Sequence, residues 1–181
     1  MRLLRDAVVA TFALLFCSAA AQAQTTVVLP DTSQSSTVSV TVSEQARVAV
    51  PSGISFTVTN VGAATAASAV TVSVDQIVLA SATRQLRISL RADAASFTPP
   101  APGETTWDAG DVSWPVSTWT AGTGAGGVLS DSTFNTVATC DAGTAACSTS
   151  SLVFSLASKP AVQRSGTHTL VVTWKVESIG S

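Results

Sequence analysis

The chain has 181 residues, of which 46% are hydrophobic and only 11% charged, and its formal net charge is −2. Nucleic-acid surfaces need clustered Lys and Arg, so this sparse, slightly acidic charge excludes a nucleic-acid partner. Hydrophobic residues recur with regular spacing, which excludes a disordered chain.

The first 23 residues have the pattern of a secretory signal peptide. Arg2 and Arg5 form a positively charged start, and the run Ala7–Cys17 is almost wholly apolar. A small-residue cleavage site, Ala-Gln-Ala, ends at Ala23. The apolar run is shorter than the roughly 20 residues that a membrane span requires. We therefore expect a mature chain that starts at Gln24, has no membrane span, and is secreted, periplasmic or bound to the cell surface.

Removal of residues 1–23 leaves 158 residues, and it reduces the 9 basic and 11 acidic residues to 7 and 10. A chain of this length suits one domain, because it buries about 68–70% of its unfolded surface. We expect an N-terminal extension at residues 24–36 and a single domain at residues 37–181. Within the extension, Val27-Val28-Leu29 is a short apolar patch. It could add a strand to a sheet edge of another subunit, pair within its own domain, or fray.

Alternation of apolar and polar residues predicts most of the strands, because successive side chains of a strand point to opposite faces. In the first predicted strand, Val38, Val40 and Val42 face the core. The predicted strands of the first half are Thr37–Ser43, Ile54–Thr59, Val70–Val74 and Arg84–Arg91. Residues 97–128 carry many Pro and Gly, and predict a long connection with one short strand at Val112–Val116.

The second half ends in the clearest strand, within Gly166–Ile179. Its expected core-facing residues are Leu170, Val172, Trp174 and Val176; only Val171 breaks the alternation. Two further strands are predicted around Phe134–Val137 and at Leu152–Leu156. About eight strands with no helix between them predict an all-β fold: a single antiparallel β-sandwich, immunoglobulin-like or jelly-roll-like.

Cys140 and Cys147 are the only cysteines that remain in the mature chain. Exported proteins form disulfides, so we expect these two residues to be bonded. Their close spacing predicts a local clip on a loop rather than a bond between sheets. Two cysteines with a single distant histidine do not form a structural zinc site.

No catalytic constellation is present in the sequence. His168 is the only histidine, and it lacks the nucleophile and orienting carboxylate of a hydrolase. Residues 122–127, G-T-G-A-G-G, lack the helix and lysine of a phosphate-binding loop and predict a flexible loop. We expect neither enzymatic activity nor a cofactor.

Asp108 and Asp111 are the best candidates for metal ligands, because carboxylate oxygens bind calcium. No calcium-loop pattern surrounds them, and two such residues on a loop are usually just solvated. We therefore expect no metal site.

Trp107, Trp114 and Trp119 cluster in the long connection and allow two readings. Exposed together, they could stack on sugar rings or dock on a partner, which defines an alternative function as a carbohydrate-binding or other ligand-binding module. Buried, they would fill the core beneath the connection, and this is the reading that we favour.

The final strand, S-G-T-H-T-L-V-V-T-W-K-V at residues 165–176, resembles the closing strand of many secreted bacterial β-sandwich proteins, including pilin-like and surface-layer-associated subunits. The resemblance implies a bacterial surface protein whose partners are other surface proteins or copies of itself, and it identifies no functional residue. We expect a secreted, non-enzymatic protein with a structural or adhesive role at the cell surface.

Overall fold

The computed structural model describes residues 35–180, and within that range it is all-β apart from one short 3-10 turn, η1 (Ala109–Asp111). The chain divides into two compact units after Val40, and every strand assigned in residues 35–180 lies in the second unit. No helix in the described range is long and apolar enough to cross a membrane. The strands are β1 (Gln45–Ala49), β2 (Thr65–Ala66), β3 (Val70–Val78), β4 (Gln85–Ala92), β5 (Val112–Trp114), β6 (Thr118–Trp119), β7 (Gly122–Gly124), β8 (Gly127–Val128), β9 (Asn135–Cys140), β10 (Cys147–Leu152), β11 (Ser155–Leu156) and β12 (Val172–Ile179).

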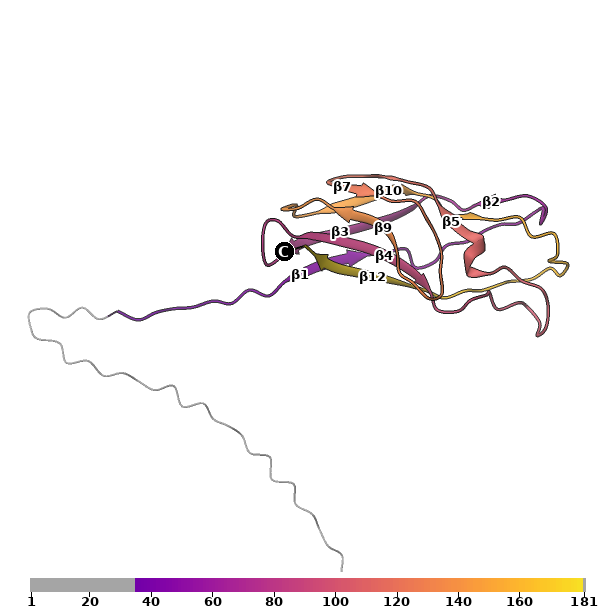
Figure 1. Ribbon diagram of the computed structural model, residues 1–181, viewed down its shortest axis with the longest axis horizontal. Helices are drawn as coiled ribbons and strands as arrows, with labels where there is room; N and C mark the ends of the chain where they lie inside the picture. Colours follow the sequence, from indigo (N-terminus) through magenta and orange to yellow (C-terminus); the bar gives the residue numbers. More distant parts are fainter. Residues whose placement is uncertain (1–34, 181) are drawn as a thin grey trace, which may run out of the picture. The chain divides into compact units, whose positions relative to one another are not determined.

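The strands form three antiparallel sheets (Figure 1). A five-stranded sheet has the order β12-β4-β9-β7-β6, and a three-stranded sheet has the order β1-β3-β10. A four-stranded sheet, β2-β11-β5-β8, continues the three-stranded one, because β2 leads into β3 and β10 leads into β11. β1 and β12 are each an edge strand of their sheet.

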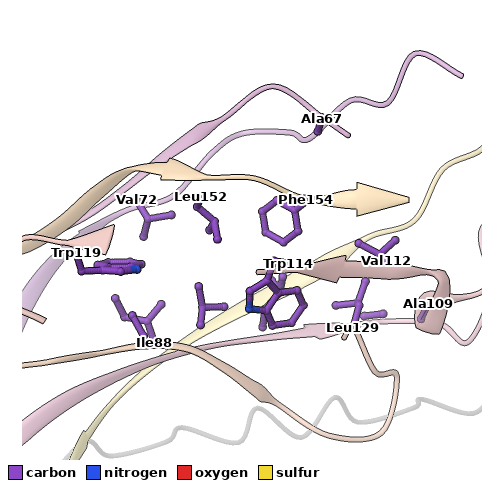
Figure 2. Close-up of a cluster of buried hydrophobic side chains, with 14 of the residues drawn as sticks. Ala67, Val72, Ile88, Ala109, Val112, Trp114, Trp119, Leu129, Leu152 and Phe154 are labelled. Carbon is purple, nitrogen blue, oxygen red and sulfur yellow. The ribbon is translucent and has the colours of Figure 1, made fainter. Parts of the chain in front are cut away.

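The core lies between the sheets (Figure 2). Val72 of β3 and Leu152 of β10 point across it toward Ile88 of β4, and all three side chains are fully buried. Phe154 packs on Trp114 with 5.8 Å between the ring centroids. The antiparallel β-sandwich predicted from the alternation of the sequence is therefore confirmed.

The strands at β4 and β12 match the predicted ones closely. The two strands pair in continuous register from Val172 opposite Ala92 to Ile179 opposite Gln85. On β4 the residues expected to face inward, Leu86, Ile88 and Leu90, are buried. Long, strictly alternating segments are the easiest strands to predict, because both faces are specified by the sequence.

The prediction of a strand at Thr37–Ser43 is wrong. No strand is assigned there, and Val38, Val40 and Val42 are 88%, 84% and 68% exposed rather than core-facing. Alternation shows that a segment can form a strand, but a strand also needs an edge to pair with. The edge of β3 is taken by β1, which begins only at Gln45.

The prediction of a flexible loop at residues 122–127 is also wrong. Gly122–Gly124 forms β7, which pairs with β9 and with β6, and Gly127 belongs to β8. The backbone lies too close to neighbouring side chains for a larger residue: a Cβ on Gly127 would lie 2.7 Å from the Trp114 ring. The small residues that suggested flexibility in fact let the backbone pass over buried tryptophans.

The disulfide between Cys140 and Cys147 is present, with 5.7 Å between the two Cα atoms. The expectation that this disulfide is a local clip on a loop is wrong. Cys140 ends β9 in the five-stranded sheet, and Cys147 begins β10 in the three-stranded sheet. Both side chains are buried, so this bond links the two layers through the core even though it closes a short loop.

Candidate functional site

A groove with an apolar centre lies between the N-terminal and the C-terminal extended segments of the domain. Residues 44–61 line one side and residues 162–178 the other, in antiparallel order, through three successive cavities. The first cavity lies between β1 and β12, which run near each other in Figure 1. The central cavity has a volume of about 460 Å³ and the third one about 460 Å³. The groove therefore follows most of the length of the sandwich.

The central cavity reaches the core of the domain. Ile54 and Phe56 form one wall, and Val172 and Trp174 form the other. Leu90, Val112, Leu129 and Phe154, which are all at least 95% buried, also line it. The residues of this cavity include no titratable side chain. The surface offered by the central cavity is thus an opening into the hydrophobic core.

The first wall is extended but belongs to no sheet. Ile54, Phe56 and Val58 are partly buried while Ser55 and Thr57 are exposed, as the predicted strand at Ile54–Thr59 requires. No strand is assigned between Val50 and Asn60, however. This segment has the burial pattern of a strand without a paired neighbour.

The second wall is an open sheet edge. β12 pairs with β4 on one side, and in the described part of the chain no strand pairs with its other side. Leu170, Val172, Trp174 and Val176 pack against the core as predicted but are only partly buried. Val171 is 67% exposed on the same segment. An edge of this kind presents unpaired N–H and C=O groups together with apolar side chains, and it is a template for another strand.

Polar contacts fix both ends of the groove. At one end the Oε1 atom of Glu44 accepts hydrogen bonds from the backbone N–H of Ala80 at 2.6 Å, from the guanidinium of Arg84 at 3.1 Å and from the hydroxyl of Ser178 at 3.4 Å. At the other end His168 lies 2.8 Å from the hydroxyl of Thr106. The walls are therefore held in place while the space between them is open.

His168 contacts Trp107 and Thr106. Its ring packs edge-on against Trp107 with 5.2 Å between centroids, and its Nδ1 atom is bound to Thr106. The other nitrogen, Nε2, is buried without a hydrogen-bond partner among the described residues. His168 lines the third cavity, within the second wall of the groove at residues 162–178.

The three tryptophans of the long connection lie in the core. Trp107, Trp114 and Trp119 are 5%, 2% and 7% exposed. Their indole N–H groups donate within the domain to the carbonyl of Ala157, the carbonyl of Ala125 and the hydroxyl of Ser117, respectively. This burial leaves little of the three indole surfaces accessible for stacking on a sugar ring. Trp107 also lines the third cavity, and Trp174, which sequence reasoning assigned to the core alone, lines the central one.

Asp108 and Asp111 bind a lysine. The Nζ atom of Lys159 lies 2.6 Å from Asp108 Oδ2 and 2.8 Å from Asp111 Oδ2. The hydrogen bond from Lys159, with a second from Ser96, lowers the pKa of Asp108 below its ordinary value. Desolvation opposes protonation of Lys159, but the two carboxylates outweigh it and raise the pKa of the ammonium group. No group of three metal-binding side chains occurs in residues 35–180.

The groove itself was not predicted from the sequence. Alternation identified both walls, but it cannot show that two strand-like segments face each other without a strand between them. One signal was available at Leu170-Val171-Val172, where apolar residues point to both faces of the segment. A half-buried strand rarely needs this, whereas an edge that receives a partner does.

No protein-family model matches this chain, and no curated protein or solved structure is significantly similar to it. The groove is therefore the feature from which a function can be inferred.

Proposed function

We propose that this is an exported, non-enzymatic β-sandwich protein with a structural or adhesive role at the cell surface, and that its groove holds an extended polypeptide segment. The observation that carries the proposal is the open seam between residues 44–61 and β12. The seam is long and its central cavity is apolar, and residues 54–58 of its first wall have the alternating burial of a strand. A polypeptide in strand conformation matches all of these properties.

A strand added between the two walls would contact both of them. The backbone of the added segment would bond to the free edge of β12, and every second side chain would point into the cavities above Leu90 and Phe154. Hydrogen bonding to the main chain gives affinity in such complexes, and the side-chain pockets give specificity. Solubility of the isolated domain would improve as well, because an exposed edge invites uncontrolled pairing.

The chemistry of the central cavity favours binding over catalysis. The central cavity contains no titratable group, so it holds no general acid or base and no ionised nucleophile. A hydrolytic site would need such groups within hydrogen-bond distance of one another. The signal-like N-terminus and the disulfide are compatible with an oxidising, extracytoplasmic location.

Trp174 provides an internal reporter for this function, because it lines the central cavity and is only partly buried, whereas the other three tryptophans are almost fully buried. Filling the groove should remove its ring from water. We expect synthetic peptides with alternating valine to shift the fluorescence to shorter wavelength in a saturable way, and to protect it from acrylamide quenching. Trp174→Phe is the control, because the signal should vanish with the reporter.

A peptide of the same composition with scrambled, non-alternating order tests the strand geometry. Equal binding of both peptides would contradict a strand-binding groove, as would the absence of binding by either. For the location, antibody labelling of intact cells of the producing organism should detect the protein. Detection only after cell lysis would contradict a role at the surface.

A further inference from the structure

The segment Thr37–Ser43 has the alternation of a strand, but it belongs to no strand of the described residues. Val38, Val40 and Val42 occupy alternate positions, and each is more than two-thirds exposed. Thr37, Ser39, Thr41 and Ser43 lie between them. The segment thus has one apolar and one hydroxyl-rich face, and the apolar face is in water. Three exposed valines at alternate positions form one apolar face, and contiguous exposed apolar surface is a mark of an interaction site.

The segment and the groove agree in length and spacing. Thr37–Ser43 has seven residues and extends about 23 Å as a strand. The wall Val50–Phe56 of the central cavity also has seven residues. The three valines repeat with a period of two, as Leu170, Val172 and Trp174 do on the opposite wall. A strand laid between the walls would therefore place each valine over the core opening and each hydroxyl in water.

The segment cannot reach the central cavity of its own domain by a tight turn. Glu44, which follows the segment directly, is fixed by Ala80, Arg84 and Ser178. A two-residue hairpin at Ser43–Glu44 would set Thr37 opposite Val50, where the central cavity only begins. The hairpin would cover β1 and leave the central cavity open. This stretch also lacks the Gly, Asn or Asp that such turns require.

We infer that the groove of one molecule receives Thr37–Ser43 of a second copy of this chain, which becomes the missing strand beside β12. The inference rests on the proposed function of the groove and names its occupant. The donated segment and the accepting groove are different surfaces of the chain, so the contact is head-to-tail. Each molecule that donates its segment still has an open groove, and the assembly grows as a linear fibre rather than as a closed dimer.

A matched pair of charge variants of the full mature chain tests the apolar face. Val40→Asp places a carboxylate where the inserted strand faces the core, and Ser39→Asp places the same charge one residue away on the opposite face. Light scattering after size-exclusion chromatography should show concentration-dependent oligomers for the wild type and for Ser39→Asp. Val40→Asp should require at least a tenfold higher concentration to associate, because the groove offers no partner for a buried charge. Both variants leave the folded domain untouched, so thermal unfolding monitored by circular dichroism should be the same for monomers of each.

Mixed cross-linking separates insertion between molecules from insertion within one. Ser39 and Ser55 are exposed and point away from the core, so cysteines there would not fill the groove. A mixture of the Ser39→Cys chain and the Ser55→Cys chain should yield a disulfide-linked dimer that contains one copy of each. A chain with both substitutions that forms only a cross-linked monomer would overturn the inference. A wild-type protein that stays monomeric at every concentration would overturn it as well.

A synthetic peptide with the sequence of residues 37–43 separates failure of this inference from failure of the proposed function. Added to the Val40→Asp protein, it should fill the vacant groove and shift the fluorescence of Trp174. If the peptide binds but full chains do not associate, the groove binds strands and its natural partner is another protein. If neither occurs, the proposed function fails together with the inference.

Discussion

Trp174 lies directly opposite Leu90 in the β12–β4 pairing, yet the two differ in burial: Leu90 is 1% exposed, whereas Trp174 is only partly buried. Opposed residues of neighbouring strands point to the same face of a sheet. The difference therefore reflects position across the sheet. Leu90 is covered on both sides, and Trp174 stands on the edge that faces the groove.

This difference predicts unequal costs of truncation. Phe154→Ala removes a ring that is 1% exposed and should reduce the free energy of unfolding by about 3–5 kcal/mol. Trp174→Ala should cost less, because part of that ring is already in water. Urea unfolding measures both. Val171→Ala, at a residue that is 67% exposed, is the control and should change the stability by about 0.5 kcal/mol or less. A loss at Trp174 as large as at Phe154 would show that the groove is closed in solution.

Reduction of the disulfide should lower the stability by at most about 2.5 kcal/mol, because chain entropy for so short a loop gives no more. Intact mass with and without reductant should differ by two hydrogens, and alkylation of the native protein should label no thiol. The melting temperature should then fall without loss of cooperative unfolding. A protein that unfolds completely on reduction would show that the link between β9 and β10 contributes more than loop closure.

The glycines near the buried tryptophans should be intolerant of a methyl group. Gly127→Ala brings Cβ within 2.7 Å of the Trp114 ring, and overpacking of this kind costs about 1–3 kcal/mol. Gly110→Ala meets no atom within 4 Å and should change the stability by about 0.5 kcal/mol or less. Thermal unfolding of the two variants gives the comparison. Similar melting temperatures would mean that β8 shifts readily away from the tryptophan.

The ion cluster of Lys159 should make stability depend on pH at both extremes. The pKa of Asp108 lies below its ordinary value of 3.8, so its stabilising effect is complete above that value and is lost as the pH falls through the lower folded pKa. The pKa of Lys159 lies above its ordinary value of 10.5, so its contribution is complete below that value and is lost as the pH rises through the higher folded pKa.

Lys159→Met should therefore lower the melting temperature most between these limits. In the variant the pKa of Asp108 should return toward its ordinary value, so the remaining acid-induced loss begins at higher pH. Melting temperatures of both proteins from pH 3 to pH 11 test this. Curves that stay parallel across the whole range would show that the cluster does not contribute to stability through its charges.

The fold was predictable wherever the alternation was long and the partner lay in the same chain. Leu86, Ile88 and Leu90 belong to a strand with neighbours on both sides, and their burial follows directly from the pattern. Val38 and Val40 have an equally clean pattern, but the pattern carries no information about which edge receives them. Periodicity shows that a segment can form a strand and which of its faces is apolar. It does not show which other strand the segment pairs with.

The site was less predictable than the fold, because it is an open space between two segments that have no strand between them. Trp107, Trp114 and Trp119 were visible as a cluster, and their burial agrees with the reading favoured from the sequence. The groove depends instead on the distance between two segments more than 100 residues apart in the sequence, residues 50–56 and β12. Only the three-dimensional arrangement of the walls shows it.

The hydrogen bonds of Glu44 have a mechanical consequence. They tie the point where the N-terminal segment leaves the domain to the β3–β4 connection, through Ala80 and Arg84, and to the end of β12, through Ser178. Tension applied to the preceding residues therefore enters the domain at three contacts that share the load. The hydrogen bonds between β1 and β3 would begin to break only after these contacts break. The carboxylate of Glu44 therefore protects β1 when the chain is pulled from its N-terminal side.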